Sequence, residues 1–211
     1  MIANLQKEIQ PLIQRVQKTQ HGFADILKAA EEVFANQSKA ETLSLAKELF
    51  ASDIHQARVL ATFLFGKLSA KSKESFGFLR KRVSQDKDWR VQETLAKAFD
   101  QYCSDSGYEK SLPVIKDWLA DENPNVRRAV TEGLRIWTSR DYFREHPELA
   151  IQLLSQLCAD ESEYVRKSVG NALRDISRKH KDLIQKELQS WNVSDRHIMQ
   201  TYKLAGKFLE D

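Results

Sequence analysis

The sequence predicts an all-α fold, an α-solenoid of about six stacked helical pairs that forms a right-handed, curved superhelix with a concave groove. Two observations lead to this prediction: the chain has few turn-forming residues, and it contains a repeat with helical periodicity. The 211 residues include only 7 Gly and 4 Pro, about half of average usage. Because sandwiches and barrels need Gly-rich turns every 8–12 residues or so, a sheet-rich fold is disfavoured.

Three segments of the chain align without gaps and define the repeat. Each opens with Asp and reaches Val five residues later, and the valines (Val91, Val126 and Val165) lie 35 and 39 residues apart. Apolar residues follow each Val at the fourth and eighth positions and a small residue at the seventh, which describes one stripe along a helix. A fainter copy starts at Val59 and places Gly66 at the small position, where close helix approach is permitted.

A helix-start signal precedes each Val of the repeat. Asp88, Asn123 and Ser162 stand three residues before it and are good N-caps. Pro124 falls at the first helical position, where its missing N–H is not needed. Another apolar helical stretch comes before each start, so the unit is a helix pair of about 35–40 residues, as in HEAT and armadillo repeats.

These paired helices and their flanks account for the whole chain. The first helices of the pairs are expected at 76–83, 112–119 and 149–157, and further helices at 5–16, 23–34, 43–50, 183–191 and 198–209. Since the linkers are short throughout, residues 1–211 are predicted to form a single HEAT-like repeat domain.

Composition and motifs limit the chemistry. Lys and Arg number 33 and Asp and Glu 30, so the net charge of +3 is too small to indicate nucleic acid by itself. Cys103 and Cys158 form no CxxC pair, the five His form no HxxxH or HExxH pair, and no Gly-rich phosphate loop occurs. No apolar run approaches the roughly 18 residues of a membrane span, and the start of the chain lacks an apolar signal segment. We expect a cytoplasmic monomer with no metal, no cofactor and no membrane contact.

Charges at the helix starts fall into two classes. Arg127 and Arg166 follow their Val directly, six residues after an Asp, which is the spacing of the structural ladder between HEAT repeats. The next position holds Glu93, Arg128 and Lys167. A cation near a helix N-terminus opposes the helix dipole by about 0.3–1 kcal/mol, so helix stability does not explain Arg128 and Lys167. They are either solvated or directed into the groove of the solenoid, where they would suit phosphate.

Trp89 stands at the first turn of its helix with Glu93 four residues later, so both side chains project from one face. A Trp at a helix start is more often a packing residue than a ligand contact. The pair alone is therefore weak evidence for a binding site.

Three motifs taken in order are more specific. Trp89-x-x-x-Glu93, then Val-Arg-Arg-Ala at 126–129, then the segment 164–174 (Tyr-Val-Arg-Lys-Ser-Val-Gly-Asn-Ala-Leu-Arg) resemble the AlkD family. These are bacterial HEAT-like repeat DNA glycosylases that excise bulky or cationic N-alkylated purines in base excision repair. The similarity is best over about residues 75–180.

The resemblance implies a divided set of site residues. Trp89 matches the Trp that opens the helix in active members, but Glu93 stands where those members have an Asp against the deoxyribose of the lesion. Arg128 matches an Arg that grips phosphate, and Arg174 matches a second Arg. Asn171 occupies the place of a Trp that packs against the damaged nucleotide. The phosphate-binding half is retained, and the lesion-contacting half is altered at two places.

The resemblance therefore implies a DNA-binding protein with weak or no glycosylase activity. Its partner would be double-stranded or branched DNA, contacted mainly at phosphates by Arg128, Lys167 and Arg174, with Asn171 nearby and with Arg80 and Arg82 as further candidates. Two alternatives stay open. One is an active alkylpurine glycosylase that uses Glu93 as its carboxylate, and the other is a protein-binding solenoid scaffold.

Overall fold

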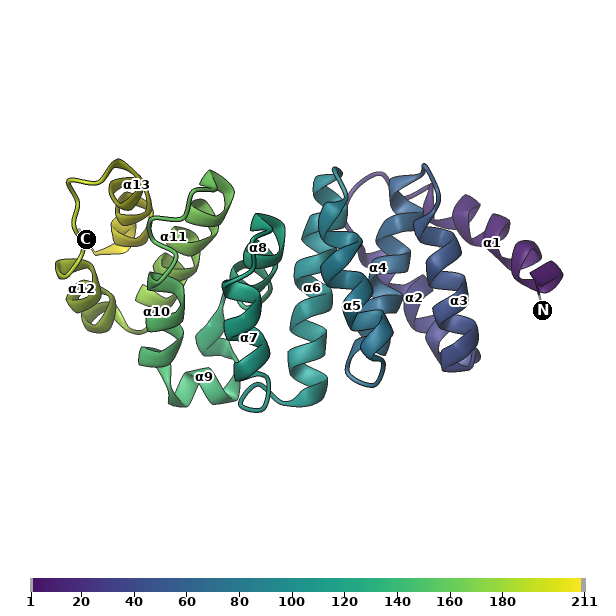
Figure 1. Cartoon of the computed structure of the whole chain (residues 1–211), viewed down its shortest axis with the longest axis horizontal. Coiled ribbons are helices and arrows are strands. Elements are labelled where there is room, and N and C mark those ends of the chain that lie inside the picture. Colours follow the sequence, from purple (N-terminus) through teal and green to yellow (C-terminus); the bar gives the residue numbers. More distant parts are fainter. Residues whose placement is uncertain (1, 210–211) are drawn as a thin grey trace. The chain divides into compact units, whose positions relative to one another are not determined.

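The structure, a computed structural model, describes residues 2–209, with side chains described from residue 9 onward. It is all-helical: within the described residues there are thirteen α-helices, three short 3₁₀ segments and no strands (Figure 1). The predicted all-α, HEAT-like fold is confirmed, with one helix more than the twelve or so expected. The helices group into two compact units, residues 1–105 and 106–211, which are described separately below.

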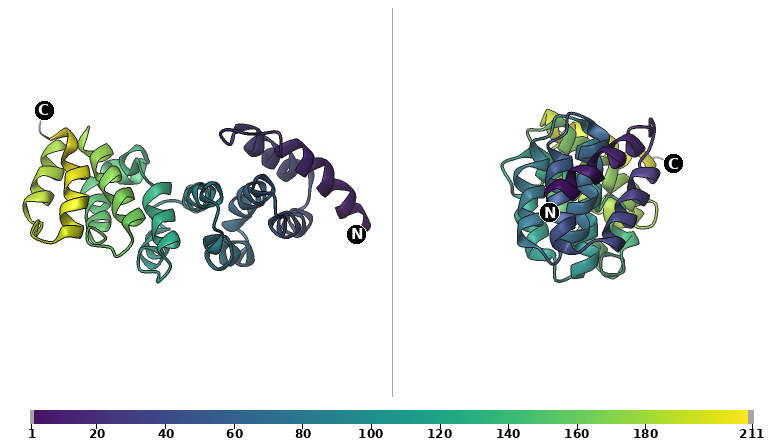
Figure 2. Two further views of the ribbon diagram at one scale, coloured as in Figure 1. Left: turned by 90° about the horizontal axis from the view of Figure 1, so that it is seen from above. Right: turned by 90° about the vertical axis from the view of Figure 1, so that its right-hand side faces the viewer.

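The first unit has two rows of helices. Its helices are α1 (Ile2–Val16), α2 (Ala24–Asn36), α3 (Lys39–Phe50), α4 (His55–Ser69), α5 (Lys73–Lys81) and α6 (Trp89–Ser106), with a 3₁₀ turn at Val83–Gln85. Figure 2 (left) shows α4 and α6 in one row and α3 and α5 in the other. The row is tight because Gly66 of α4 faces Ala98 of α6: a Cβ on Gly66 would lie 2.9 Å from the Ala98 Cβ. The close approach predicted at Gly66 is confirmed, although the corrected register given below does not place Gly66 at the seventh position of the repeat.

The second unit repeats this arrangement. Its helices are α7 (Leu112–Leu119), α8 (Pro124–Gly133), α9 (Asp141–Glu145), α10 (Pro147–Ser155), α11 (Glu163–Ser177), α12 (Lys181–Gln189) and α13 (Arg196–Ala205), with 3₁₀ turns at Trp137–Ser139 and Gly206–Phe208. Helix α8 packs on α11 and α11 on α13. The repeat did not predict α9 or the turn before it, where the buried Trp137 ring lies 4.9 Å from Phe143.

The Asp that opens each repeat shapes the chain before the second helix. The side-chain oxygens of Asp86, Asp121 and Asp160 each accept the backbone N–H two residues later at 2.8 Å. The predicted N-caps differ in how they act. The Asn123 side chain accepts the N–H of Asn125 at 2.9 Å, whereas the Ser162 hydroxyl makes no capping hydrogen bond. Ser162 occupies the N-cap position, but Asp160 orders its turn.

The predicted structural ladder is present in the second unit. Arg127 donates from Nε and Nη2 to the carboxylate of Asp160, both at 2.7 Å, across 33 residues of sequence. Its Nη1 donates to the carbonyls of Asp121 and Glu122 in its own turn. Arg166 is buried and makes the same two carbonyl contacts one repeat later. Both arginines are therefore structural.

The same contacts correct the register of the first repeat copy. Arg58 donates from Nε to Asp86 at 2.6 Å and from Nη1 to two carbonyls of its preceding turn. This is the pattern of Arg127, so Arg58 is its equivalent and Ala57 takes the place of the Val. The alignment on Val59 is wrong by two residues. Ala57 fills the Val position of this repeat copy. Its side chain is so small that the larger Val59 gives the stronger apolar signal in the sequence.

Candidate functional site

The start of α6 presents an indole to solvent. Trp89 is 66% exposed, so its indole is not packed in the interior. The Arg90 guanidinium lies 5.4 Å from the centre of the Trp89 ring. Two hydrogen bonds of 2.9 Å tie Arg90 in turn to the carboxylate of Asp88. Glu93 lies one helical turn beyond Trp89 and is partly buried. The first unit thus offers an aromatic surface, held by a cation, beside a carboxylate.

Ion pairing and burial shift two pKa values at this corner. Hydrogen bonds from the Arg90 side chain hold the pKa of Asp88 below its ordinary value of 3.8. Burial lowers the pKa of His55, and the charge of Arg90 lowers it further. Both shifts have the same consequence: the folded state binds protons less readily than the unfolded chain, so acid favours unfolding.

Asp88→Asn is expected to lower the free energy of unfolding by about 1 kcal/mol at neutral pH, because the charged partner of Arg90 is lost while the capping oxygen stays. The contribution of Asp88 is present above its unfolded pKa and is lost as the pH falls through its lower folded pKa. Urea unfolding at about pH 7 and at about pH 3 or below should show the two proteins converging. An equal gap at both pH values would contradict the assignment.

In the second unit the two predicted arginines lie at the ends of one chain of charges. Arg128 is 3.9 Å from Glu132, Glu132 is 3.8 Å from Arg135, and Arg135 donates to Asp175 at 2.9 Å. Asp175 then pairs with Arg174 at 3.3 Å. These five side chains comprise three cations and two carboxylates, so the network has a net charge of +1. The structure thus brings Arg128 and Arg174 into one network that links α8 to α11.

Lys167 and Asn171 are the other two predicted site residues on α11. The Lys167 ammonium pairs with Glu163 at 2.6 Å, with half of its side chain exposed. Asn171 is partly buried one turn further along the helix. Next to Glu163, Tyr164 is 74% exposed. A Lys that already has an acidic partner on its own helix must exchange that partner for phosphate, which weakens its net contribution to binding.

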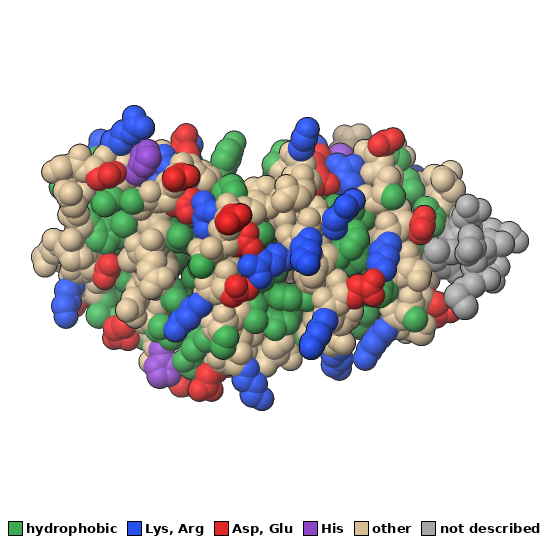
Figure 3. All heavy atoms as spheres, in the orientation of Figure 1, with side chains coloured by type: hydrophobic (Ala, Val, Ile, Leu, Met, Phe, Trp, Pro, Cys, Tyr) green, Lys and Arg blue, Asp and Glu red, His purple; other side chains and the backbone are tan. Residues whose placement is uncertain are grey.

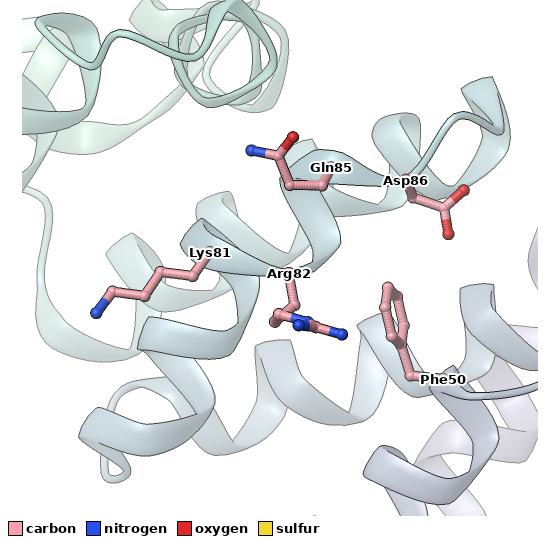
Figure 4. Close-up of a pocket in the computed structure, with 5 residues that line it drawn as sticks. All are labelled: Phe50, Lys81, Arg82, Gln85 and Asp86. Atoms are coloured by element: carbon pink, nitrogen blue, oxygen red, sulfur yellow. The ribbon is translucent and has the colours of Figure 1, made fainter.

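Arg80 and Arg82 lie at the end of α5, not on α6, which carries Trp89 and Glu93. Arg80 is in the last turn of α5 and Arg82 is its C-cap. Basic side chains gather over α3 and α5 in Figure 3. Arg82 lines a pocket of about 230 Å³ with Phe50, Lys81, Gln85 and Asp86 (Figure 4). Cations at a helix C-terminus are favoured by the helix dipole, which explains them without a ligand.

The residues that connect Arg128 to Arg174 do not follow from the sequence motifs. Arg135 lies two residues beyond the end of α8, in the turn that leads to Trp137, so helical spacing from Arg128 does not identify it. Its partner Asp175 is 40 residues away in sequence, and no local pattern connects the two. Within the described residues no group of three or more His, Cys, Asp or Glu is placed to hold a metal ion, and no helix there is long and apolar enough to cross a membrane.

Solved structures of known proteins resemble this chain in sequence and in fold. AlkD2 from Streptococcus mutans has a crystal structure that matches with a TM-score of 0.96 at 47% identity, over 98% of this chain and 100% of that one. Alkylpurine DNA glycosylase AlkC from Pseudomonas fluorescens, solved bound to DNA containing an abasic site analogue, matches with a TM-score of 0.52 at 25% identity. The chain spans 63% of that AlkC structure.

Two sequence matches agree with the structural ones. YhaZ of Bacillus subtilis, an uncharacterised protein, is 37% identical over 105 residues, which are 48% of this chain and 29% of YhaZ. The chain thus matches less than a third of that relative's length. Residues 22–204 match the family described as DNA alkylation repair enzyme. The chain therefore belongs to the family of DNA alkylation repair enzymes.

Proposed function

We propose that the protein binds DNA through phosphates and has weak or no alkylpurine glycosylase activity. The observation that carries the proposal is the exposed indole of Trp89 at the start of α6. An exposed Trp held by a neighbouring Arg is a poor packing residue and a good surface for a nucleotide, since base–aromatic stacking contributes about 1–3 kcal/mol per base. The DNA-bound AlkC structure supports a DNA partner within the same family.

The phosphate contacts come from the network on α8 and α11. Arg128 and Arg174 are both mostly covered, with 21% and 18% of their side chains exposed, so their guanidinium groups are held in place before DNA arrives. A positioned guanidinium binds phosphate with a smaller loss of side-chain entropy than a free one. Lys167 adds a cation at the cost of its pair with Glu163.

Weak activity follows from the two altered positions. Loss of a cationic purine leaves an oxocarbenium-like sugar, which a nearby carboxylate stabilises. Glu93 supplies the charge but on a side chain one methylene longer than Asp, and a misplacement of about 1 Å costs around 10²-fold in rate. Asn171 offers no aromatic shelf. Release of 7-methylguanine from methylated duplex DNA, measured against the spontaneous rate, tests this directly.

Arg128→Gln is expected to weaken binding of duplex DNA and to reduce the slope of log K against log salt by about 1, since one phosphate contact is lost. Fluorescence anisotropy at several salt concentrations measures both. Lys116→Gln on α7 is the matched control, because Lys116 is an exposed cation of the same unit outside the network. A flat salt dependence of the wild-type protein would refute the proposal and favour a scaffold role.

A further inference from the structure

A second basic site lies at one end of the charge network, within residues 106–211. Arg135, Ile136, Thr138, Arg174, Asp175, Arg178 and Lys179 line a pocket of about 480 Å³. It is formed where the 3₁₀ turn after α8 meets the C-terminal half of α11. Its volume falls in the range of roughly 300–1,000 Å³ typical of small-molecule sites. Neither Arg178 nor Lys179 follows from the family resemblance.

The pocket carries an excess of positive charge. Four of its lining residues are cations, and among the described residues Asp175 is the one carboxylate that lines it. Asp175 is already engaged by Arg135 and Arg174. Glu132 neutralises one further charge from α8 through its 3.8 Å contact with Arg135. The groups named here therefore sum to four positive and two negative charges, and this excess favours an anion.

The guanidinium groups of the pocket are held from behind. Arg174 and Arg178 are one turn apart on α11, and their guanidinium carbons lie 5.6 Å and 5.0 Å from the centre of the Phe208 ring. The Nε of Arg174 is buried and has no hydrogen-bond partner among the described residues. The contact with Phe208 helps to fix where these cations sit without using N–H donors, although Arg174 already donates from Nη2 to Asp175.

One wall of the pocket is apolar. Ile136 lines the pocket and is 53% exposed, although large aliphatic side chains are usually buried. A bare phosphate ion would leave this wall and most of the volume unused. A phosphate that carries a sugar and a base would cover both, because nucleotides combine a charged group with an apolar face.

We propose that this pocket binds the phosphate group of a nucleotide, with the sugar or base against Ile136. This proposal rests on the proposed function, because it takes the nucleotide to be part of a DNA strand. A single strand or a branch has unpaired bases, so its nucleotides can enter the pocket. Arg178 and Lys179 are the residues specific to this contact, since Arg135 and Arg174 are also held by Asp175.

The test compares Arg178→Gln/Lys179→Gln with Lys110→Gln/Lys116→Gln, which removes two exposed cations from the same unit outside the pocket. Binding of a labelled 16-nucleotide single strand is measured by anisotropy over a range of salt concentrations. The pocket variant is expected to bind on the order of tenfold more weakly at 0.1 M salt, with a slope reduced by about 0.7, since each phosphate contact of a single strand contributes about 0.7. The control variant should match the wild type.

Two further arms separate the sources of the phosphate. Deoxyadenosine monophosphate is titrated into each protein by calorimetry, and Arg128→Gln is included in the strand assay. Mononucleotide binding that depends on Arg178 and Lys179, without any effect on the strand, would overturn the DNA assignment and leave a free-nucleotide site. Equal strand affinity and equal mononucleotide binding in both double variants would overturn the pocket altogether. If Arg128→Gln weakens the strand in that case, the proposed function stands without the pocket.

Discussion

Asp160→Ala is expected to lower the free energy of unfolding by about 3–5 kcal/mol, the largest stability effect of any single substitution discussed for this chain. The Asp160 side chain is 5% exposed and accepts two hydrogen bonds of 2.7 Å from Arg127, whose own side chain is 14% exposed. Removing the carboxylate leaves a mostly covered guanidinium without its acidic partner. It also removes the acceptor for the N–H of Ser162, which orders the turn before α11.

The matched control is Asp141→Ala, which breaks the ion pair with Arg144. The Asp141 side chain is 86% exposed, so the loss should be under about 1 kcal/mol. Urea unfolding followed by circular dichroism measures both variants. A double variant, Arg127→Met/Asp160→Leu, should recover much of the loss, since replacing both partners removes the unpaired charge. Similar losses for Asp160→Ala and Asp141→Ala would show that the ladder is not structural.

The ladder also shows why the fold was accessible from the sequence. Within one repeat the Asp and the Arg are six residues apart, and the Arg pairs with the Asp of the next repeat. A short spacing in the sequence therefore indicates a contact between residues that are 33 positions apart. Where another residue replaces the Arg of the repeat, the contact between repeats is replaced as well. Gln92 stands at the Arg position of its repeat and donates instead to the carbonyls of Val83, Ser84 and Asp86.

Features without a repeat were not accessible in this way. Trp137 and Phe143 build a buried cluster around the short α9, where apolar residues occur in a segment too short and irregular to show helical periodicity. The register of the first copy failed for a related reason: Ala57 is fully buried, yet its small side chain gives no signal that separates it from Val59 two residues later. In both segments the packing of the buried side chains determines the structure, and the sequence pattern does not reveal it.

The residue types of the candidate site can be read from the sequence, but the ion pairs that these side chains form can be read from it only in part. Spacing and resemblance identified Arg128, Lys167 and Arg174, and each has an acidic side chain within 4 Å: Glu132, Glu163 and Asp175 respectively. All three acids lie on the same helix as their cation. Glu132 and Glu163 are each four residues from their cation, so those two pairings can be read from the sequence. The exposure of Trp89 could not, since it depends on which face of α6 the neighbouring helices cover.

Glu93→Asp is expected to raise the rate of 7-methylguanine release by about 10²-fold. The substitution shortens the side chain by one methylene at the position where active members of the resembled family carry Asp, which returns the carboxylate to the sugar. Excision from methylated duplex DNA, quantified as released base over time against protein-free DNA, measures the change. Asn171→Trp in the same background should add to it by restoring an aromatic surface.

Glu93→Gln separates charge from geometry. It keeps the length of Glu93 and removes the negative charge, so release should fall to the spontaneous rate while DNA binding is unchanged or slightly stronger, as the carboxylate repels phosphate. If the wild-type protein already excises efficiently and Glu93→Asp slows it, Glu93 is itself the working carboxylate and the protein is an active glycosylase. If Glu93→Asp releases no more base than Glu93→Gln although both bind DNA, the altered Asn171 rather than side-chain length accounts for the loss of activity.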